Sequence, residues 1–135
     1  MSASDAFFDT NVLLYLLSEE VAKADRVEEL LKAGGIISVQ VLNEFAAVAV
    51  RKLAMRVAEI KEILAIIRAV CSVHPLDVET HELGLKLAER YRYSIYDSMI
   101  IASALRAGCL TVFSEDFQHG RKIDRLMIVD PFRGD

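Results

Sequence analysis

The sequence predicts one α/β domain in three layers, with helices on both faces of a short parallel sheet of about five strands. Short apolar runs alternate along the chain with longer stretches in which apolar residues recur at helical spacing. Most of the short runs are apolar at consecutive positions, as is typical of strands covered on both faces. A chain of 135 residues has the size of a single domain, so residues 1–135 are assigned to one domain.

In the first half of the chain we expect two strands, 6–9 and 36–39, and three helices, 11–17, 21–33 and 41–53. The second helix is amphipathic, and the glycine pair Gly34-Gly35 ends it. Ser38 precedes the third helix, where its hydroxyl can accept a hydrogen bond from a free backbone amide, so it is expected to be the N-cap.

In the second half we expect three helices, 56–70, 78–91 and 95–107, and three strands, 71–74, 110–113 and 126–129. Pro75 closes the first of these strands, and Gly108 ends the last helix. Crossovers between parallel strands are right-handed, and ligands of such open sheets bind beyond the carboxyl ends of the strands. The residues that directly follow each strand are therefore the first candidates for a functional site.

The composition indicates a cytoplasmic protein. No apolar run reaches the roughly 18 residues that span a bilayer, and no basic segment precedes an apolar core at the N-terminus. Cys71 and Cys109 both occupy apolar positions, which suits buried reduced thiols better than a disulfide or a zinc site.

The formal net charge of −4 is unfavourable for a protein that binds nucleic acid, because phosphate contacts come from Lys and Arg. Two interpretations stay open: a bound cation neutralises a cluster of acids, or the chain does not bind nucleic acid. Basic residues do cluster locally, although solvated helix faces explain these clusters equally well: Arg51, Lys52 and Arg56; Arg90 and Arg92; Arg121, Lys122 and Arg125.

Asp9 and Glu44 are the first two candidate site residues. Asp9 ends the first strand, where it could simply cap the next helix, although three consecutive polar residues exceed what one cap needs. Glu44 lies among apolar residues on its helix and has no Lys or Arg three or four positions away. Burying it without a partner would cost several kcal/mol, so either the helix turns Glu44 towards solvent or the acid has a function.

Asp97 and Asp116 complete the candidate set. Ser94-x-x-Asp97 resembles a capping box at the start of a helix, which does not exclude a second role for the carboxylate. Asp116 lies in the loop after the strand at 110–113. All four acids can converge at one edge of a parallel sheet, where they would repel one another unless a cation is present. Carboxylate oxygens favour magnesium or manganese over zinc.

Four motifs in this order resemble the PIN-domain family and, more narrowly, the VapC-type toxins of toxin–antitoxin pairs. They are Phe8-Asp9-Thr10-Asn11, Asn43-Glu44-Phe45, Tyr96-Asp97-Ser98-Met99 with the apolar helix that follows, and Ser114-Glu115-Asp116-Phe117. The family's four acids map to Asp9, Glu44, Asp97 and Asp116, and its polar residues beside them map to Asn11 and Ser114.

The resemblance implies an endoribonuclease of the PIN fold, a cognate antitoxin, and a homodimer. As a hypothesis, the carboxylates hold one or two Mg²⁺ or Mn²⁺ ions that activate water to hydrolyse an RNA phosphodiester. Asp9, Asp97 and Asp116 would be ligands, Glu44 a ligand or a group that orients the water, and Asn11 and Ser114 would fix the carboxylates. His119 is expected to be a surface loop residue, and Tyr15 and Tyr96 to be packing residues.

The main alternative is a non-catalytic interaction module, in which the acids hold a structural metal or receive an arginine from a partner. A phosphatase or receiver-like domain with Asp9 as nucleophile fits less well, because it needs a second aspartate where this chain has Asn11.

Overall fold

The computed structural model describes residues 6–133 of the chain. Its centre is one sheet with the strand order β3-β2-β1-β4-β6-β5. The strands are β1 (Ala6–Phe8), β2 (Gly35–Ser38), β3 (Cys71–His74), β4 (Thr111–Phe113), β5 (Lys122–Ile123) and β6 (Leu126–Val129). All pairings are parallel except the antiparallel pair β5–β6.

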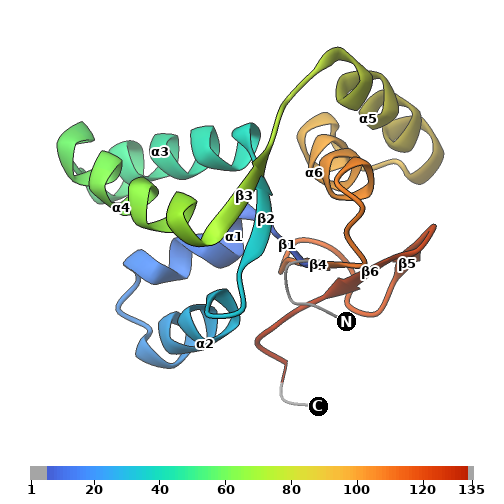
Figure 1. Ribbon diagram of the computed structural model, residues 1–135. Helices are drawn as coiled ribbons and strands as arrows, with labels where there is room; N and C mark the ends of the chain where they lie inside the picture. The colour runs from blue at the N-terminus through green and yellow to red at the C-terminus, as the bar shows by residue number, and fades with distance from the viewer. Residues whose placement is uncertain (1–5, 134–135) are drawn as a thin grey trace.

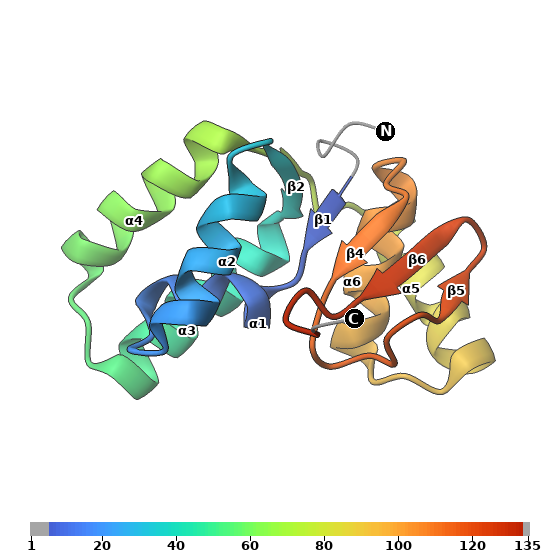
Figure 2. The same ribbon diagram turned by 90° about the horizontal axis from the view of Figure 1, so that it is seen from below.

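The helical elements cover this sheet on both faces. They are α1 (Thr10–Leu13), the 3-10 helix η2 (Leu14–Leu17), α2 (Val21–Leu31), α3 (Val39–Leu53), α4 (Val57–Val70), α5 (Val78–Tyr91) and α6 (Ile95–Arg106). Helices α1 to α4 lie on one side of the strands, and α5 and α6 on the other (Figure 1). The view from below shows the same division (Figure 2). The predicted three-layer α/β fold is confirmed.

The strand order explains this division of helices. The chain steps from β1 to β2 to β3 in one direction and then returns past β1 to form β4. Right-handed crossovers therefore place the helices of the first two connections on one face and those of the third on the other. The reversal occurs at β1, so the carboxyl ends of β1 and β4 lie side by side at the point where such sheets bind ligands.

The centre of the sheet is buried. All three residues of β1 are inaccessible or nearly so, and Phe45 of α3 and Ile101 of α6 reach the same core from opposite faces. Cys71 and Cys109 are both buried and neither forms a disulfide, as expected. Within residues 6–133, no helix combines the length and the apolarity needed to cross a bilayer.

Several predicted boundaries are confirmed. The strands at 71–74 and 126–129 and the helix at 78–91 have the predicted bounds, and the Ser38 hydroxyl accepts a hydrogen bond from the amide of Val41 at the start of α3. Gly34 has a φ of +84°, a left-handed conformation that suits the chain reversal after α2.

Several details of the prediction were wrong. The sheet has six strands where about five were predicted, and it is mixed rather than parallel, because β5 forms a short antiparallel hairpin with β6 through Asp124 at a φ of 53°. A two-residue strand is too short to show a periodicity. The predicted helix at 11–17 is a single α-helical turn that continues as η2, and Asp9 lies outside β1.

Candidate active site

Asp9 lies directly beyond the carboxyl end of β1, where it is the N-cap of α1. One carboxylate oxygen, Oδ1, accepts a hydrogen bond from the amide of Thr10 at 2.7 Å. The other, Oδ2, accepts one from the Ser114 hydroxyl at 2.7 Å, and the residue is only 5% exposed. Asp9 is therefore the N-cap that the sequence suggested. Capping uses only one of its two carboxylate oxygens, Oδ1.

This environment opposes ionisation of Asp9. Burial raises the pKa of its carboxyl to about 7, although the hydrogen bonds from Ser114 and Thr10 lower it. The negative charges of Asp116 and Glu44 raise it further. A carboxyl that is buried among other carboxyls requires either a proton or a cation, and at neutral pH these two compete for it.

Glu44 lies on α3, which begins directly after β2 and packs against α1. Its side chain is half-buried, and Oε1 accepts a hydrogen bond from the Thr10 hydroxyl at 2.8 Å. This position explains why an acid occurs in an apolar stretch of helix. The side of α3 that carries Glu44 faces Asp9 and Thr10 rather than the core. Thr10 therefore connects the two acids: its amide binds Asp9 and its hydroxyl binds Glu44.

The loop after β4 supplies Ser114 and Asp116. Ser114 is fully buried, and its hydroxyl oxygen accepts hydrogen bonds from the Asp116 amide at 3.1 Å and from Asn11 Nδ2 at 3.4 Å. Asn11 Oδ1 in turn accepts a bond from the Glu115 amide at 3.3 Å. Asn11 and Ser114 thus fix the loop against Asp9, whereas Asp116 itself is exposed.

Asp97 lies in the first turn of α6. The Ser94 hydroxyl accepts a hydrogen bond from the Asp97 amide at 3.2 Å, so Ser94 is the N-cap that the sequence predicted. Partial burial raises the pKa of the Asp97 carboxyl, the Ser94 contact lowers it, and the charge of Asp116 raises it. The charge of Asp116 therefore acts on both Asp9 and Asp97.

One cleft of about 310 Å³ contains all four predicted acids. Its other polar lining residues are Thr10, Asn11 and the cationic Arg51. Of the basic residues singled out in the sequence, Arg51 lines this cleft, whereas the guanidinium of Arg121 lies over the rings of Tyr91 and Tyr93.

The donor set of the cleft fits a hard divalent cation. Its ligating groups are carboxylate oxygens, which Mg²⁺ and Mn²⁺ prefer. Within residues 6–133, however, no three acidic, histidine or cysteine side chains are grouped closely enough to hold an ion where they stand. Binding would therefore require the acids to move closer together, or water molecules to bridge them to the ion.

A larger apolar groove of about 1110 Å³ adjoins the cleft and shares Glu44, Ala47 and Arg51 with it. Tyr96 lines this groove and is 70% exposed, so its expected packing role was wrong: it lies on the outer side of the first turn of α6. Tyr15 does pack, edge-on against Phe132 at 4.9 Å between ring centroids. His119 is half-buried, and its Nδ1 accepts a hydrogen bond from the Asp130 amide at 3.0 Å, which gives it a structural role in the loop.

The fold and the cleft together define a class: three-layer α/β domains with an acidic cleft at the reversal point of the sheet. Residues 6–124 match the family model described as the PIN domain. The chain therefore belongs to the PIN domain family. No curated protein sequence matches it.

Solved structures with the same fold include toxins of toxin–antitoxin pairs. VapC20 of Mycobacterium tuberculosis, described as a sarcin–ricin loop cleaving toxin, is 21% identical, with a TM-score of 0.66 over 82% of this chain and 91% of that one. A toxin–antitoxin complex from Klebsiella pneumoniae is 18% identical, with a TM-score of 0.71 over 94% and 98%. VapBC2 of Rickettsia felis, bound to a promoter DNA fragment, is 18% identical, with a TM-score of 0.66 over 91% and 96%. At these identities the similarity establishes the fold.

Proposed function

We propose that this protein is a metal-dependent endoribonuclease and the toxin of a toxin–antitoxin pair. The observation that carries the proposal is the convergence of Asp9, Glu44, Asp97 and Asp116 on one cleft beyond β1 and β4. The PIN family consists typically of metal-dependent nucleases, and the acids of this cleft are the groups that would bind the metal.

In the proposed site, Asp9, Asp97 and Asp116 hold one or two Mg²⁺ or Mn²⁺ ions, with Glu44 as a further ligand or as the group that orients water. Bound metal would supply Lewis-acid activation of water and of the phosphodiester, for hydrolysis to 5′-phosphate and 3′-hydroxyl ends. Hydrogen bonds hold the proposed ligands in place: Ser114 and Thr10 each bind one carboxylate oxygen of Asp9. Thr10 also fixes Glu44.

Arg51 is the group we assign to the RNA backbone. It lies in the last turn of α3, and it lines both the acidic cleft and the adjoining groove. A guanidinium at that place can bind phosphate oxygens with two parallel hydrogen bonds and offset the negative charge of the acids. The overall charge of −4 is then compatible with an anionic substrate.

A cognate antitoxin and a second copy of the chain are the proposed protein partners. Several large apolar side chains are well exposed, among them Val57 and Ile66 of α4 and Val78 of α5. Protein interfaces are marked by contiguous apolar patches, whereas these side chains are spread over two helices, so the proposed partners rest mainly on the similar structures. One of the similar solved structures is described as a toxin–antitoxin complex, which supports the same arrangement here.

Cleavage of RNA tests the catalytic proposal. Purified protein is incubated with a mixture of single-stranded RNAs in Mn²⁺ or Mg²⁺, and then with EDTA. We expect cleavage that stops on chelation and that Asp97→Asn abolishes. Asp25→Asn is a matched control, because Asp25 is an exposed acid of α2 that lies outside the cleft, and it should cleave like the wild type.

Intact RNA with the wild type, across several substrates and without antitoxin, would instead favour the non-catalytic interaction module. In that case the cleft would serve to bind a metal or a partner's arginine, and the wild type and Asp97→Asn would be indistinguishable in the cleavage assay.

A further inference from the structure

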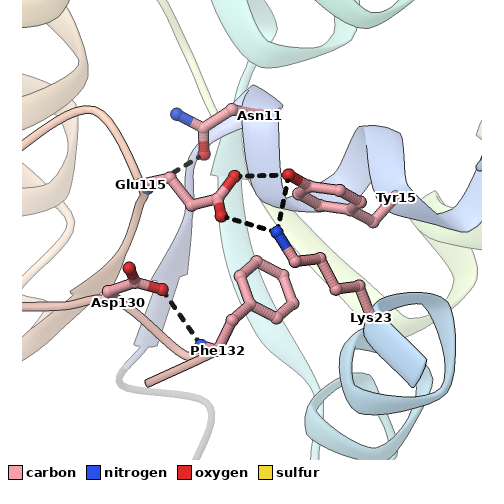
Figure 3. Close-up of polar contacts among 6 residues, drawn as sticks. All are labelled: Asn11, Tyr15, Lys23, Glu115, Asp130 and Phe132. Carbon is pink, nitrogen blue, oxygen red and sulfur yellow. Dashed lines mark hydrogen bonds and ion pairs between the residues drawn. The ribbon is translucent and has the colours of Figure 1, made fainter. Parts of the chain in front are cut away.

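Glu115 lies between the two site residues Ser114 and Asp116, but its side chain turns away from the acidic cleft. Tyr15 of η2 donates its hydroxyl to Glu115 Oε1 at 2.7 Å, and Lys23 of α2 binds Oε2 at 3.2 Å (Figure 3). Asn11 holds the backbone amide of the same residue. Since both of its carboxylate oxygens are engaged, Glu115 serves as an anchor of the loop rather than as a fifth acid of the cleft.

Lys23 is itself held firmly. Its ammonium also bonds the Tyr15 hydroxyl at 3.1 Å and lies over the rings of Tyr15 at 4.6 Å and of Phe132 at 5.0 Å. The side chains of Lys23 and Glu115 are 33% and 25% exposed, whereas those of the pair Lys32–Glu29 are 74% and 64% exposed. The Lys23–Glu115 pair is half-buried, so water screens it less than it screens the exposed pair Lys32–Glu29.

Asp116 has few other restraints. It is exposed and lies outside any strand or helix, and its hydrogen bond to the rest of residues 6–133 runs from its amide to the Ser114 hydroxyl. On its far side, Phe117 is buried and packs edge-on against Tyr93 at 5.1 Å. The position of the Asp116 carboxylate relative to Asp9 therefore depends on the Ser114 contact and on the two anchors that flank Asp116, Glu115 and Phe117.

We propose that Lys23 and Tyr15 are positioning residues, which hold Glu115 and thereby place the Asp116 carboxylate for binding a divalent cation. This inference rests on the proposed function for its claim that the site binds a divalent cation. The claim that Lys23 and Tyr15 fix the loop through Glu115 does not depend on that function. It assigns a functional role to α2 and η2, two elements that supply no side chain of the acidic set.

Mn²⁺ titrations of wild type, Lys23→Met and Glu115→Gln test the proposal, because simple electrostatics predicts opposite effects of the two substitutions. Removing the positive charge of Lys23 should tighten binding of a cation, and removing the negative charge of Glu115 should weaken it. Loss of positioning weakens both. We expect Mn²⁺ affinity to fall about 10-fold in each variant, in the range seen for groups that orient metal ligands.

Hydrogen–deuterium exchange supplies a readout without metal or RNA. The amides of Glu115 and Asp116 are bonded to Asn11 and Ser114, so they should exchange faster in Lys23→Met if the loop is released. Lys32→Met is the matched control: the same substitution breaks an exposed ion pair at the other end of α2 and should alter neither readout. If Lys23→Met fails to fold, Tyr15→Phe removes one hydroxyl and should show the same two changes to a smaller degree.

The outcomes separate the two proposals. Unchanged or tighter Mn²⁺ binding in folded Lys23→Met would overturn the positioning role, whether or not the wild type cleaves RNA. Wild-type protein that binds Mn²⁺ but cleaves no RNA would overturn the nuclease alone. Wild-type protein that binds no Mn²⁺ would overturn both.

Discussion

Asp9→Asn is expected to reduce the metal-dependent cleavage of RNA by about 100-fold or more while leaving the fold intact. Loss of groups that merely orient a metal ligand typically costs 10-fold to 100-fold, and Asp9 is proposed as a ligand itself. The asparagine retains an oxygen for the amide of Thr10, so the cap of α1 is preserved. The loss of activity would then reflect a missing charge rather than a missing helix.

Initial rates in saturating Mn²⁺ measure this effect. Asp25→Asn again serves as the control for a lost negative charge elsewhere on the surface. A rate for Asp9→Asn within a few-fold of the wild type would show that the buried acid of the cleft does not take part in the reaction.

In the metal-free protein, the raised pKa of Asp9 is expected to lower the stability of the fold as the pH rises from about 4 to above 7, and Asp9→Asn should remove this contribution. The pKa of the Asp9 carboxyl is about 7 in the folded chain, against an ordinary value of 3.8. The folded state therefore binds a proton more tightly than the unfolded state, and its stabilisation is complete below pH 3.8 and gone above 7. The shift corresponds to about 4 kcal/mol at most.

Urea unfolding in EDTA at pH 5 and at pH 8 measures this difference. We expect the free energy of unfolding of the wild type to fall by a few kcal/mol between these pH values, relative to Asp9→Asn. The variant should be the more stable protein at pH 8, since it does not bury a charge there. Parallel pH profiles for the two proteins would contradict the raised pKa of Asp9.

The fold was predictable because its elements are long or strongly patterned. Helix α5 shows its periodicity within a single segment, strand β6 is a continuous apolar run, and Ser38 is a residue type that favours the N-cap of α3. Strand β5 could not be predicted, because two residues carry no pattern and their pairing depends on the turn at Asp124. The strand that the sequence missed, β5, lies at the edge of the sheet, and neither of its residues lines the cleft.

The sequence could point to a site residue where an acid had no structural explanation among its neighbours in the chain. Glu44 had no partner on its own helix, and its partner is Thr10, 34 positions away in the sequence. Adjacent acids in a loop look alike in their chemistry, and only the resemblance of the motif around Ser114 favoured Asp116 over Glu115 as the site residue. Only the folded chain shows that Asp116 lines the cleft while Glu115 binds Lys23, 92 positions away.

The exposure of Tyr96 could not be predicted from the sequence either. An aromatic residue in an apolar helix is expected in the core, but the start of α6 presents this one to the groove instead. Where a helix begins fixes which of its first residues face outward, and that depends on the Ser94 cap and on neighbouring elements.

Calorimetric titration of Mn²⁺ into the metal-free protein at pH 7.5 tests most directly whether the four acids form a cation site. The proposed function predicts saturable binding of one or two ions to the wild type and to Asp25→Asn. It predicts binding weakened by about 10-fold or more in Asp97→Asn and in Asp9→Asn, since each removes a proposed ligand. Binding that is absent from the wild type, or equal in all four proteins, would contradict the site.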